Sequence, residues 1–134
     1  MIKIRYNVFE TNSSSVHSLI MTDEDTFKKL ENGSLMIAGY EANCKDEFIT
    51  YERAYEMLKQ LYADPNERRR INEDYIIDNL EDCPRDIIED IMDAKEIAYT
   101  LENYGGEEYE KFEEYYTSPS GDKIVAFGYF GRDG

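Results

Sequence analysis

The residue types that could carry out covalent chemistry gather in one short N-terminal segment. Glu10 and His17 flank the hydroxyl-rich stretch Thr11-Asn12-Ser13-Ser14-Ser15. Serine, histidine and carboxylate are the groups of nucleophilic catalysis, and the backbone N–H groups of such a loop can also cradle an anion. Three adjacent serines do not mark one nucleophile, and no glycine-rich elbow surrounds them. We therefore favour a hydrogen-bonded connection with His17 on a strand over a small enzyme that uses Glu10, a serine of 13–15 and His17.

A second candidate is a stripe of acidic side chains on a helix that is predicted to begin near Pro84. The stripe follows i, i+3, i+4 and i+7 spacing on one side of the helix and consists of Asp86, Glu89, Asp90 and Asp93, with Glu96 as a further candidate. From Asp86 to Asp93 the stripe extends about 10 Å along the helix axis, which is close to two phosphate intervals along a nucleic-acid strand. The spacing is typical of a nucleic-acid mimic, of a site for Mg²⁺ or Ca²⁺, or of a solvated helix face. No EF-hand loop or histidine partner accompanies it, so we expect no metal and no other cofactor.

A third candidate is a segment that mixes acidic and aromatic residues. Its candidate binding residues are Glu107, Glu108, Tyr109, Glu110, Glu113, Glu114, Tyr115 and Tyr116. Carboxylates neutralise lysine and arginine, and tyrosine rings stack on guanidinium groups, so this composition suits contact with a nucleic-acid-binding groove. A helix that packs its aromatic side inward would leave the same pattern. The basic run Arg68-Arg69-Arg70 is interpreted as structural, because acidic residues lie close enough in sequence to pair with it.

The negative charge of the chain is concentrated in its second half. The formal net charge is −15; residues 1–72 hold 12 acidic and 10 basic side chains, and residues 73–134 hold 18 acidic and 5 basic ones. A field of this sign attracts cationic partners and disfavours direct binding of nucleic acid or of an anionic membrane. A basic nucleic-acid-binding protein is therefore the expected partner. The alternative is an ordinary acidic domain with solvated helix faces.

Composition and length predict one globular domain. The 134 residues, 41% of them hydrophobic, are enough to form a packed core, so we expect a single acidic α+β domain over 1–134. No stretch approaches the roughly 20 apolar residues of a membrane span, and the N-terminus lacks the apolar run of a secretory signal. The two cysteines, Cys44 and Cys83, show no metal-ligand spacing and are read as reduced thiols. Together these features predict a cytoplasmic protein.

The elements that must position these residues follow a strand, helix, strand order. Strands are expected over 2–6, 16–21 and 35–38. Helices are expected from an N-cap at Thr22 to Asn32-Gly33, from Thr50 to Asp64, over 67–80, and from Pro84 to Tyr104 unless the chain breaks into a strand near Tyr99. A terminal β-hairpin is expected over 115–127, with its turn at 118–122. The pattern predicts an α+β fold in which N- and C-terminal strands form a small antiparallel sheet and the middle of the chain is helical.

Two motifs resemble known sequences. The segment Asn7-Val8-Phe9-Glu10-Thr11-Asn12-Ser13-Ser14-Ser15-Val16-His17-Ser18 resembles the opening of a family of small proteins from phages and mobile elements of Gram-positive bacteria. The ending over 121–128, with Tyr129 and Gly131, is similar to that family's C-terminus. The resemblance implies a phage setting, in which some proteins of this size and acidity inhibit CRISPR nucleases or restriction enzymes. It supplies no catalytic residue.

These observations predict a non-enzymatic, phage-encoded anti-defence inhibitor of the anti-CRISPR type that acts in the host cytoplasm. Its acidic surface would occupy the nucleic-acid-binding groove of a host nuclease. The alternatives are a small enzyme built on the N-terminal loop and a phage structural or assembly protein.

Overall fold

The computed structural model describes residues 4–6, 14–42, 46–105 and 110–132. The chain divides into two compact units. Unit 1 consists of Met1–Asn32 together with Glu102–Gly134, and unit 2 of Gly33–Leu101. The expectation of one domain over 1–134 stays a prediction.

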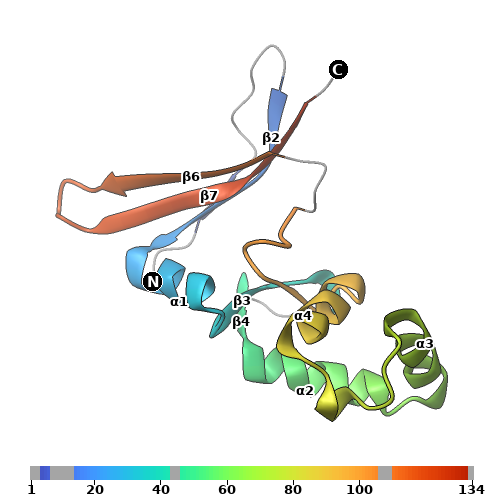
Figure 1. The fold of residues 1–134 in the computed structure, drawn as a ribbon. Helices are drawn as coiled ribbons and strands as arrows, with labels where there is room; N and C mark the ends of the chain where they lie inside the picture. The colour runs from blue at the N-terminus through green and yellow to red at the C-terminus, as the bar shows by residue number, and fades with distance from the viewer. Residues whose placement is uncertain (1–3, 7–13, 43–45, 106–109, 133–134) are drawn as a thin grey trace. The chain divides into compact units, whose positions relative to one another are not determined.

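Unit 1 is built on a four-stranded antiparallel sheet whose strands come from both ends of the chain. Its order is β1-β2-β7-β6, from β1 (Ile4–Tyr6), β2 (Ser14–Asp23), β7 (Lys123–Arg132) and β6 (Glu110–Thr117). Helix α1 (Glu24–Asn32) follows β2 directly (Figure 1). It contributes buried Phe27, whose ring centroid lies 5.3 Å from that of buried Phe127 on β7. The predicted sheet of N- and C-terminal strands is confirmed.

The N-cap of α1 lies one residue later than predicted. The Asp23 carboxylate, and not the Thr22 hydroxyl, accepts the backbone N–H of Thr26, at 2.7 Å. Burial alone would raise the pKa of the Asp23 carboxyl, but the hydrogen bonds from Thr26 bring it below its ordinary value. Strand β2 continues through Thr22, so this side chain is buried in the sheet and is unavailable as a cap. The predicted end of the helix at Asn32-Gly33 is confirmed, because α1 ends at Asn32 and Gly33 adopts the left-handed φ of 84°.

The predicted terminal hairpin is confirmed and is longer than expected. Strands β6 and β7 pair over eight consecutive residues without a register shift, from Glu110 opposite Phe130 to Thr117 opposite Lys123. The turn is closed by the backbone N–H of Ser118, which donates to the Asp122 carbonyl at 2.8 Å, and Gly121 supplies the required φ of 91°. The possibility that residues 110–116 form a helix is thereby excluded.

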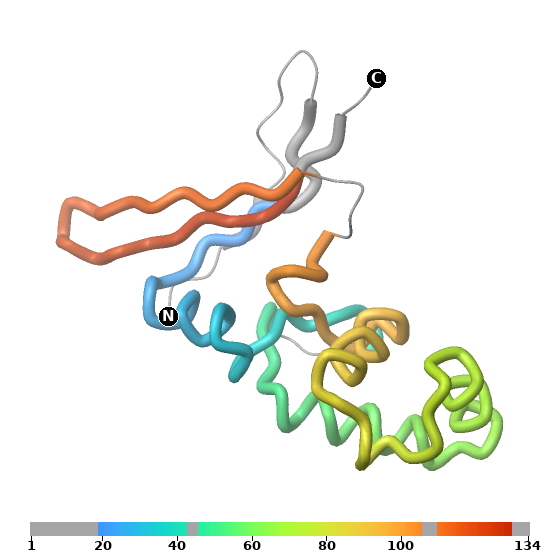
Figure 2. The backbone as a smooth tube through the Cα atoms, viewed as in Figure 1, coloured from blue at the N-terminus to red at the C-terminus, as the bar shows by residue number. Residues whose placement is uncertain are grey.

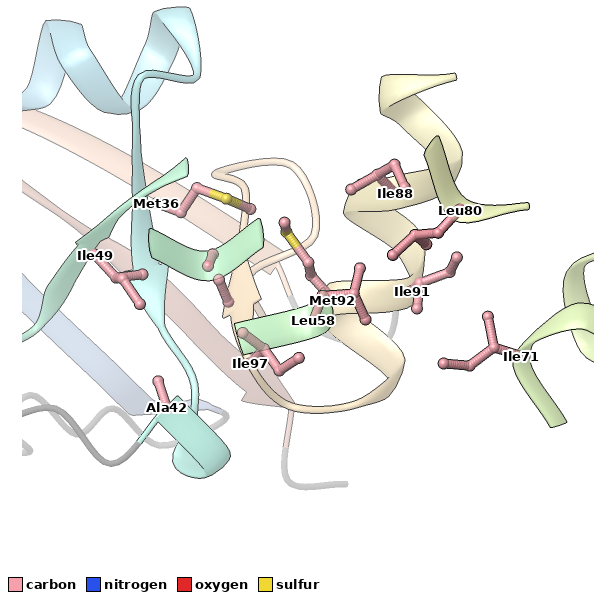
Figure 3. Packing of buried hydrophobic residues seen from close by; sticks show 12 residues of the cluster. Met36, Ala42, Ile49, Leu58, Ile71, Leu80, Ile88, Ile91, Met92 and Ile97 are labelled. Atoms are coloured by element: carbon pink, nitrogen blue, oxygen red, sulfur yellow. The ribbon is translucent and has the colours of Figure 1, made fainter. Parts of the chain in front are cut away.

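Unit 2 combines three helices with a second, three-stranded antiparallel sheet. The sheet order is β4-β3-β5, from β4 (Phe48–Thr50), β3 (Leu35–Ala38) and β5 (Ala98–Tyr99). The helices are α2 (Tyr51–Tyr62), α3 (Pro65–Tyr75) and α4 (Arg85–Ala94), with short 3-10 turns η1 (Tyr40–Ala42) and η2 (Leu80–Asp82). Their apolar faces meet in one core, in which Met36, Leu58, Ile71, Ile91 and Met92 are buried (Figure 3). The predicted cap at Thr50 is confirmed, because its hydroxyl accepts the Arg53 N–H at 3.2 Å.

Two predicted helices are shorter in the structure. Helix α3 does not run over 67–80: it ends at Tyr75, because Ile76 turns the chain with a left-handed φ of 54°, and Leu80 belongs to η2. Helix α4 does not reach Tyr104 but ends at Ala94, and the alternative strand near Tyr99 is correct. Glu96 reverses the chain with a φ of 58° and accepts the Glu41 N–H at its carbonyl, at 2.8 Å. These contacts bring 98–99 beside β3, where the chain adds a strand.

Candidate binding site

Strand β6 carries the described part of the acidic and aromatic segment along one edge of the sheet in unit 1. Within the described residues, β6 pairs with β7 alone, so its other side is the sheet edge. Figure 2 traces the two strands as the long hairpin near the C-terminus. The predicted residues Glu110, Glu113, Glu114, Tyr115 and Tyr116 all lie on this strand, whereas Glu107, Glu108 and Tyr109 lie outside the described residues.

The two strands of the hairpin differ sharply in burial. On β7, Val125 and Phe127 are buried, whereas their β6 partners Tyr115 and Glu113 are exposed. Tyr115 is 59% exposed although its ring packs edge-on against Phe27 at 6.3 Å between centroids. Strand β7 thus belongs to the core, while β6 extends the sheet into solvent and presents its side chains there.

Each face of β6 carries one tyrosine that is hydrogen-bonded to a carboxylate two residues earlier. The Tyr115 hydroxyl donates to Glu113 Oε2 at 3.2 Å, and the Tyr116 hydroxyl donates to Glu114 Oε2. Residues i and i+2 of a strand share a face and residues i and i+1 do not, so the two pairs point to opposite sides of the sheet. Both faces therefore present an aromatic ring beside a carboxylate, which is the pair of groups that receives an arginine or lysine side chain.

The charges around these tyrosines stabilise the protonated hydroxyls. Desolvation, followed by the hydrogen bond and the charge of Glu113, raises the pKa of Tyr115 above its ordinary value. The hydrogen bond to Glu114, followed by desolvation, raises the pKa of Tyr116. An anionic phenolate beside a carboxylate is unfavourable, so both hydroxyls remain donors at neutral pH. At the beginning of the strand, the Lys111 ammonium donates to the Glu102 backbone carbonyl.

The acidic stripe on α4 belongs to unit 2 and is partly neutralised. The buried side of the helix consists of Ile88, Ile91 and Met92, and the predicted residues Asp86 and Asp90 are exposed on the other side. Glu89 is half-buried and accepts from Arg85 Nε at 3.1 Å. Of the other predicted members, Asp93 is half-buried, and Glu96 lies beyond the helix in the turn to β5.

Arg85 organises this corner of unit 2, a role that sequence reasoning missed. Its guanidinium lies over the Tyr51 ring, 3.8 Å from the centroid, and donates to the Gly33 carbonyl as well as to Glu89. Gly33, Tyr51 and Arg85 are far apart in sequence, so local spacing carries no signal for the contact. The only signal is that Arg85 is the single basic residue among the acids of 73–94.

The basic run on α3 is partly paired. Arg70 contacts Glu67 at 3.4 Å, and the same carboxylate binds Lys95 at 3.1 Å, which connects α3 to the end of α4. Arg68 and Arg69 are exposed. The pairing of Arg70 with Glu67 agrees with the structural interpretation of this run.

The described part of the N-terminal segment is a strand and not a loop. Ser14 and Ser15, predicted in a connection, belong to β2, opposite Arg132 and Gly131 of β7. The sheet register shifts between Val16 and Ser18, which makes His17 the extra residue of a β-bulge. Glu10 and Ser13 lie outside the described residues.

The remaining candidate nucleophile is a cysteine. Cys83 carries a free thiol and is half-buried between η2 and α4. Burial, with a smaller contribution from Asp86, raises the pKa of this thiol, which disfavours the reactive thiolate. Cys44 lies outside the described residues.

The described residues form neither a metal site nor a membrane-spanning helix. In the described ranges, no group of three or more His, Cys, Asp or Glu side chains could hold a metal ion. None of the helices in those ranges is long and apolar enough to cross a membrane. No protein-family model, curated protein or solved structure matches the chain.

Proposed function

We propose that this chain is a non-enzymatic binding protein whose strand β6 contacts a basic, nucleic-acid-binding protein. The observation that carries the proposal is the exposed edge strand on which Glu113 and Glu114 lie beside Tyr115 and Tyr116, which are 59% and 47% exposed. Carboxylates and exposed tyrosine rings on one strand offer both ion pairing and stacking to arginine. Solvent-exposed rings of this size are typical of interface centres.

The finer form of the proposal is a phage-encoded, anti-CRISPR-type inhibitor that acts in the cytoplasm of the host cell. Its acidic surface would compete with DNA or RNA for the groove of a CRISPR nuclease. The N-terminal motif supports the phage setting by resemblance, and the net charge of −15 supports attraction to a basic groove. The exposed carboxylates Asp86 and Asp90 on α4 would supply further charge.

The experiment is a titration of a CRISPR nuclease with the whole chain at several salt concentrations. Neutralising Glu113→Gln and Glu114→Gln together should weaken binding about tenfold and reduce the dependence of affinity on salt. The matched control is Glu52→Gln with Glu56→Gln, which removes the same charge from two exposed positions of α2 in unit 2. Single exposed charges contribute little, so only the paired change is diagnostic.

Salt-independent binding, or equal losses from the two double variants, would contradict the proposed role of β6. The α4 stripe requires its own pair, Asp86→Lys with Asp90→Lys, which leaves the Glu89–Arg85 ion pair intact.

A further inference from the structure

We infer that β6 binds its partner by strand addition, in which an extended basic segment extends the sheet beyond Glu113–Thr117. The inference rests on the proposed function and specifies how the same strand is recognised. An edge strand directs the N–H and C=O groups of alternate residues away from its neighbour, where a further strand can pair with them. Within the described residues, Glu113–Thr117 has a strand neighbour only in β7, and all five side chains are exposed.

The geometry of this edge is suited to pairing. Proteins commonly block an edge with a bulge, a proline or a very short strand. Strand β6 has none of these over its eight residues and pairs with β7 without a register shift. Charged side chains on an edge also discourage aggregation, but a strand that is only protected would not expose two adjacent tyrosines, which favour strand pairing.

The negative charge of β6 determines which kind of segment can pair with it. A second copy of the chain is disfavoured because each copy carries a net charge of −15, and antiparallel self-pairing centred on the Glu113–Glu114 bond places these carboxylates opposite each other. A basic residue opposite each glutamate forms a favourable cross-strand pair instead. Because Glu113 and Glu114 point to opposite faces, the two basic residues must be consecutive in the partner.

The tyrosines define the rest of the recognised sequence. In an antiparallel addition the partner first meets Tyr116, then Tyr115, Glu114 and Glu113. Aromatic rings pair well with β-branched side chains across strands. The preferred segment, read from its N-terminus, is therefore two β-branched apolar residues followed by two basic residues.

The test uses synthetic peptides and amide hydrogen exchange of the whole chain, measured by NMR. The probe is a capped peptide Thr-Val-Val-Arg-Lys-Thr, and the control is Thr-Pro-Pro-Arg-Lys-Thr, which has the same charge but lacks two backbone donors. The probe at saturation should slow exchange at alternate amides of Glu113–Thr117 by at least about tenfold, and the control should not. Glu113→Gln with Glu114→Gln should weaken binding of the probe, whereas Glu52→Gln with Glu56→Gln should leave it unchanged.

Three outcomes would overturn strand addition: equal binding of both peptides, binding without protection of β6 amides, and no binding of the probe. Concentration-dependent dimerisation of the chain through β6, seen by sedimentation and abolished by Tyr115→Thr, would also overturn it in favour of self-pairing. None of these outcomes affects the charge-dependent titration of the nuclease, so failure of strand addition is distinguishable from failure of the proposed function.

Discussion

Thr22 offers a direct test of how unit 1 is packed. Its hydroxyl is buried and has no hydrogen-bond partner, and it is the one such side-chain group among the described residues. The side chain is 0% exposed and lies on β2 opposite Val125 of β7. Valine keeps the shape of threonine and replaces the hydroxyl with a methyl group. We expect Thr22→Val to stabilise the protein, which is an unusual outcome for a change at a buried position.

The magnitude follows from desolvation. Leaving a buried hydroxyl without a partner costs about 1–3 kcal/mol, and this cost disappears in the valine variant. The methyl group is slightly larger than the hydroxyl, and extra volume in a packed core offsets part of the gain. The free energy of unfolding should therefore rise by about 1 kcal/mol. Thr22→Ser is the matched control: it keeps the hydroxyl and loses the methyl group, so stability should fall by about 1 kcal/mol.

The assay is urea denaturation followed through backbone amide resonances, read separately for β7 in unit 1 and for α4 in unit 2. Separate resonances are needed because two compact units need not unfold in one transition. The midpoint for β7 should increase in Thr22→Val and decrease in Thr22→Ser. A valine variant that is unchanged or less stable, with serine close to wild type, would refute the reasoning, because the hydroxyl must then have a hydrogen-bond partner.

Three further substitutions test features of unit 2. Ile76→Asn should raise the melting temperature in calorimetry by a few degrees, because asparagine tolerates the left-handed φ of 54° and the 91% exposed isoleucine buries almost nothing; a lower value would contradict the strain argument. Gly39→Ala should lower the free energy of unfolding, measured in urea, by about 2 kcal/mol or more, because a Cβ there would lie 2.2 Å from the Glu96 carbonyl oxygen; a neutral result would mean that this turn shifts easily. Arg85→Ala should cost about 1–2 kcal/mol in chemical denaturation through loss of its contacts with Tyr51 and Glu89, and Arg85→Lys should recover only part of it; full recovery by lysine would mean that stacking contributes nothing.

Local sequence patterns predicted which elements exist better than where they end. Both Thr22 and Asp23 are acceptable N-caps, and the spacing of Thr22 to Asp25 favoured the earlier residue. The choice depends on β2, which pairs with β7 through Thr22 and Asp23 and buries the threonine side chain. The partner strand lies about one hundred residues away in sequence, so no local window contains the deciding information.

The end of α4 shows the same limit. Ala94, Ala98 and Leu101 continue the helical spacing of apolar residues, which predicted a helix as far as Tyr104. In the structure the helix ends at Ala94, and buried Ala98 lies in a strand opposite Ala38. Apolar spacing records that a residue is buried, but it does not distinguish burial by a helix from burial by a neighbouring strand. The left-handed Glu96 that separates the two elements is neither glycine nor asparagine, so the break has no marker in the sequence.

The candidate site was predicted in composition but not in geometry. The acidic and aromatic residues of 110–116 are recognisable in the sequence, yet helix and strand place them differently. In a strand, Glu113 faces Tyr115 and Glu114 faces Tyr116, and these are the hydrogen bonds that the structure contains. The pairing with β7 is what makes this segment a strand. The predicted hairpin over 115–127 already placed Tyr115 and Tyr116 in that strand.

The fold also divides the negative charge differently from the sequence. Cut at residue 72, the chain has a nearly neutral first half and a strongly acidic second half. Unit 1 holds 13 acidic and 7 basic residues, a net charge of −6, and unit 2 holds 17 acidic and 8 basic ones, a net charge of −9. The two acidic surfaces predicted from the second half belong to different units, β6 to unit 1 and the α4 stripe to unit 2.

Net charge therefore does not distinguish the two acidic surfaces, whereas the exposure and the pairing of their side chains do. Glu89 on α4 is bound to Arg85, whereas Glu113 and Glu114 on β6 accept hydrogen bonds from neutral tyrosine hydroxyls and keep their charge available to a cation. The exposed tyrosine rings beside these carboxylates, and not the density of acids, are the reason to place the partner on β6.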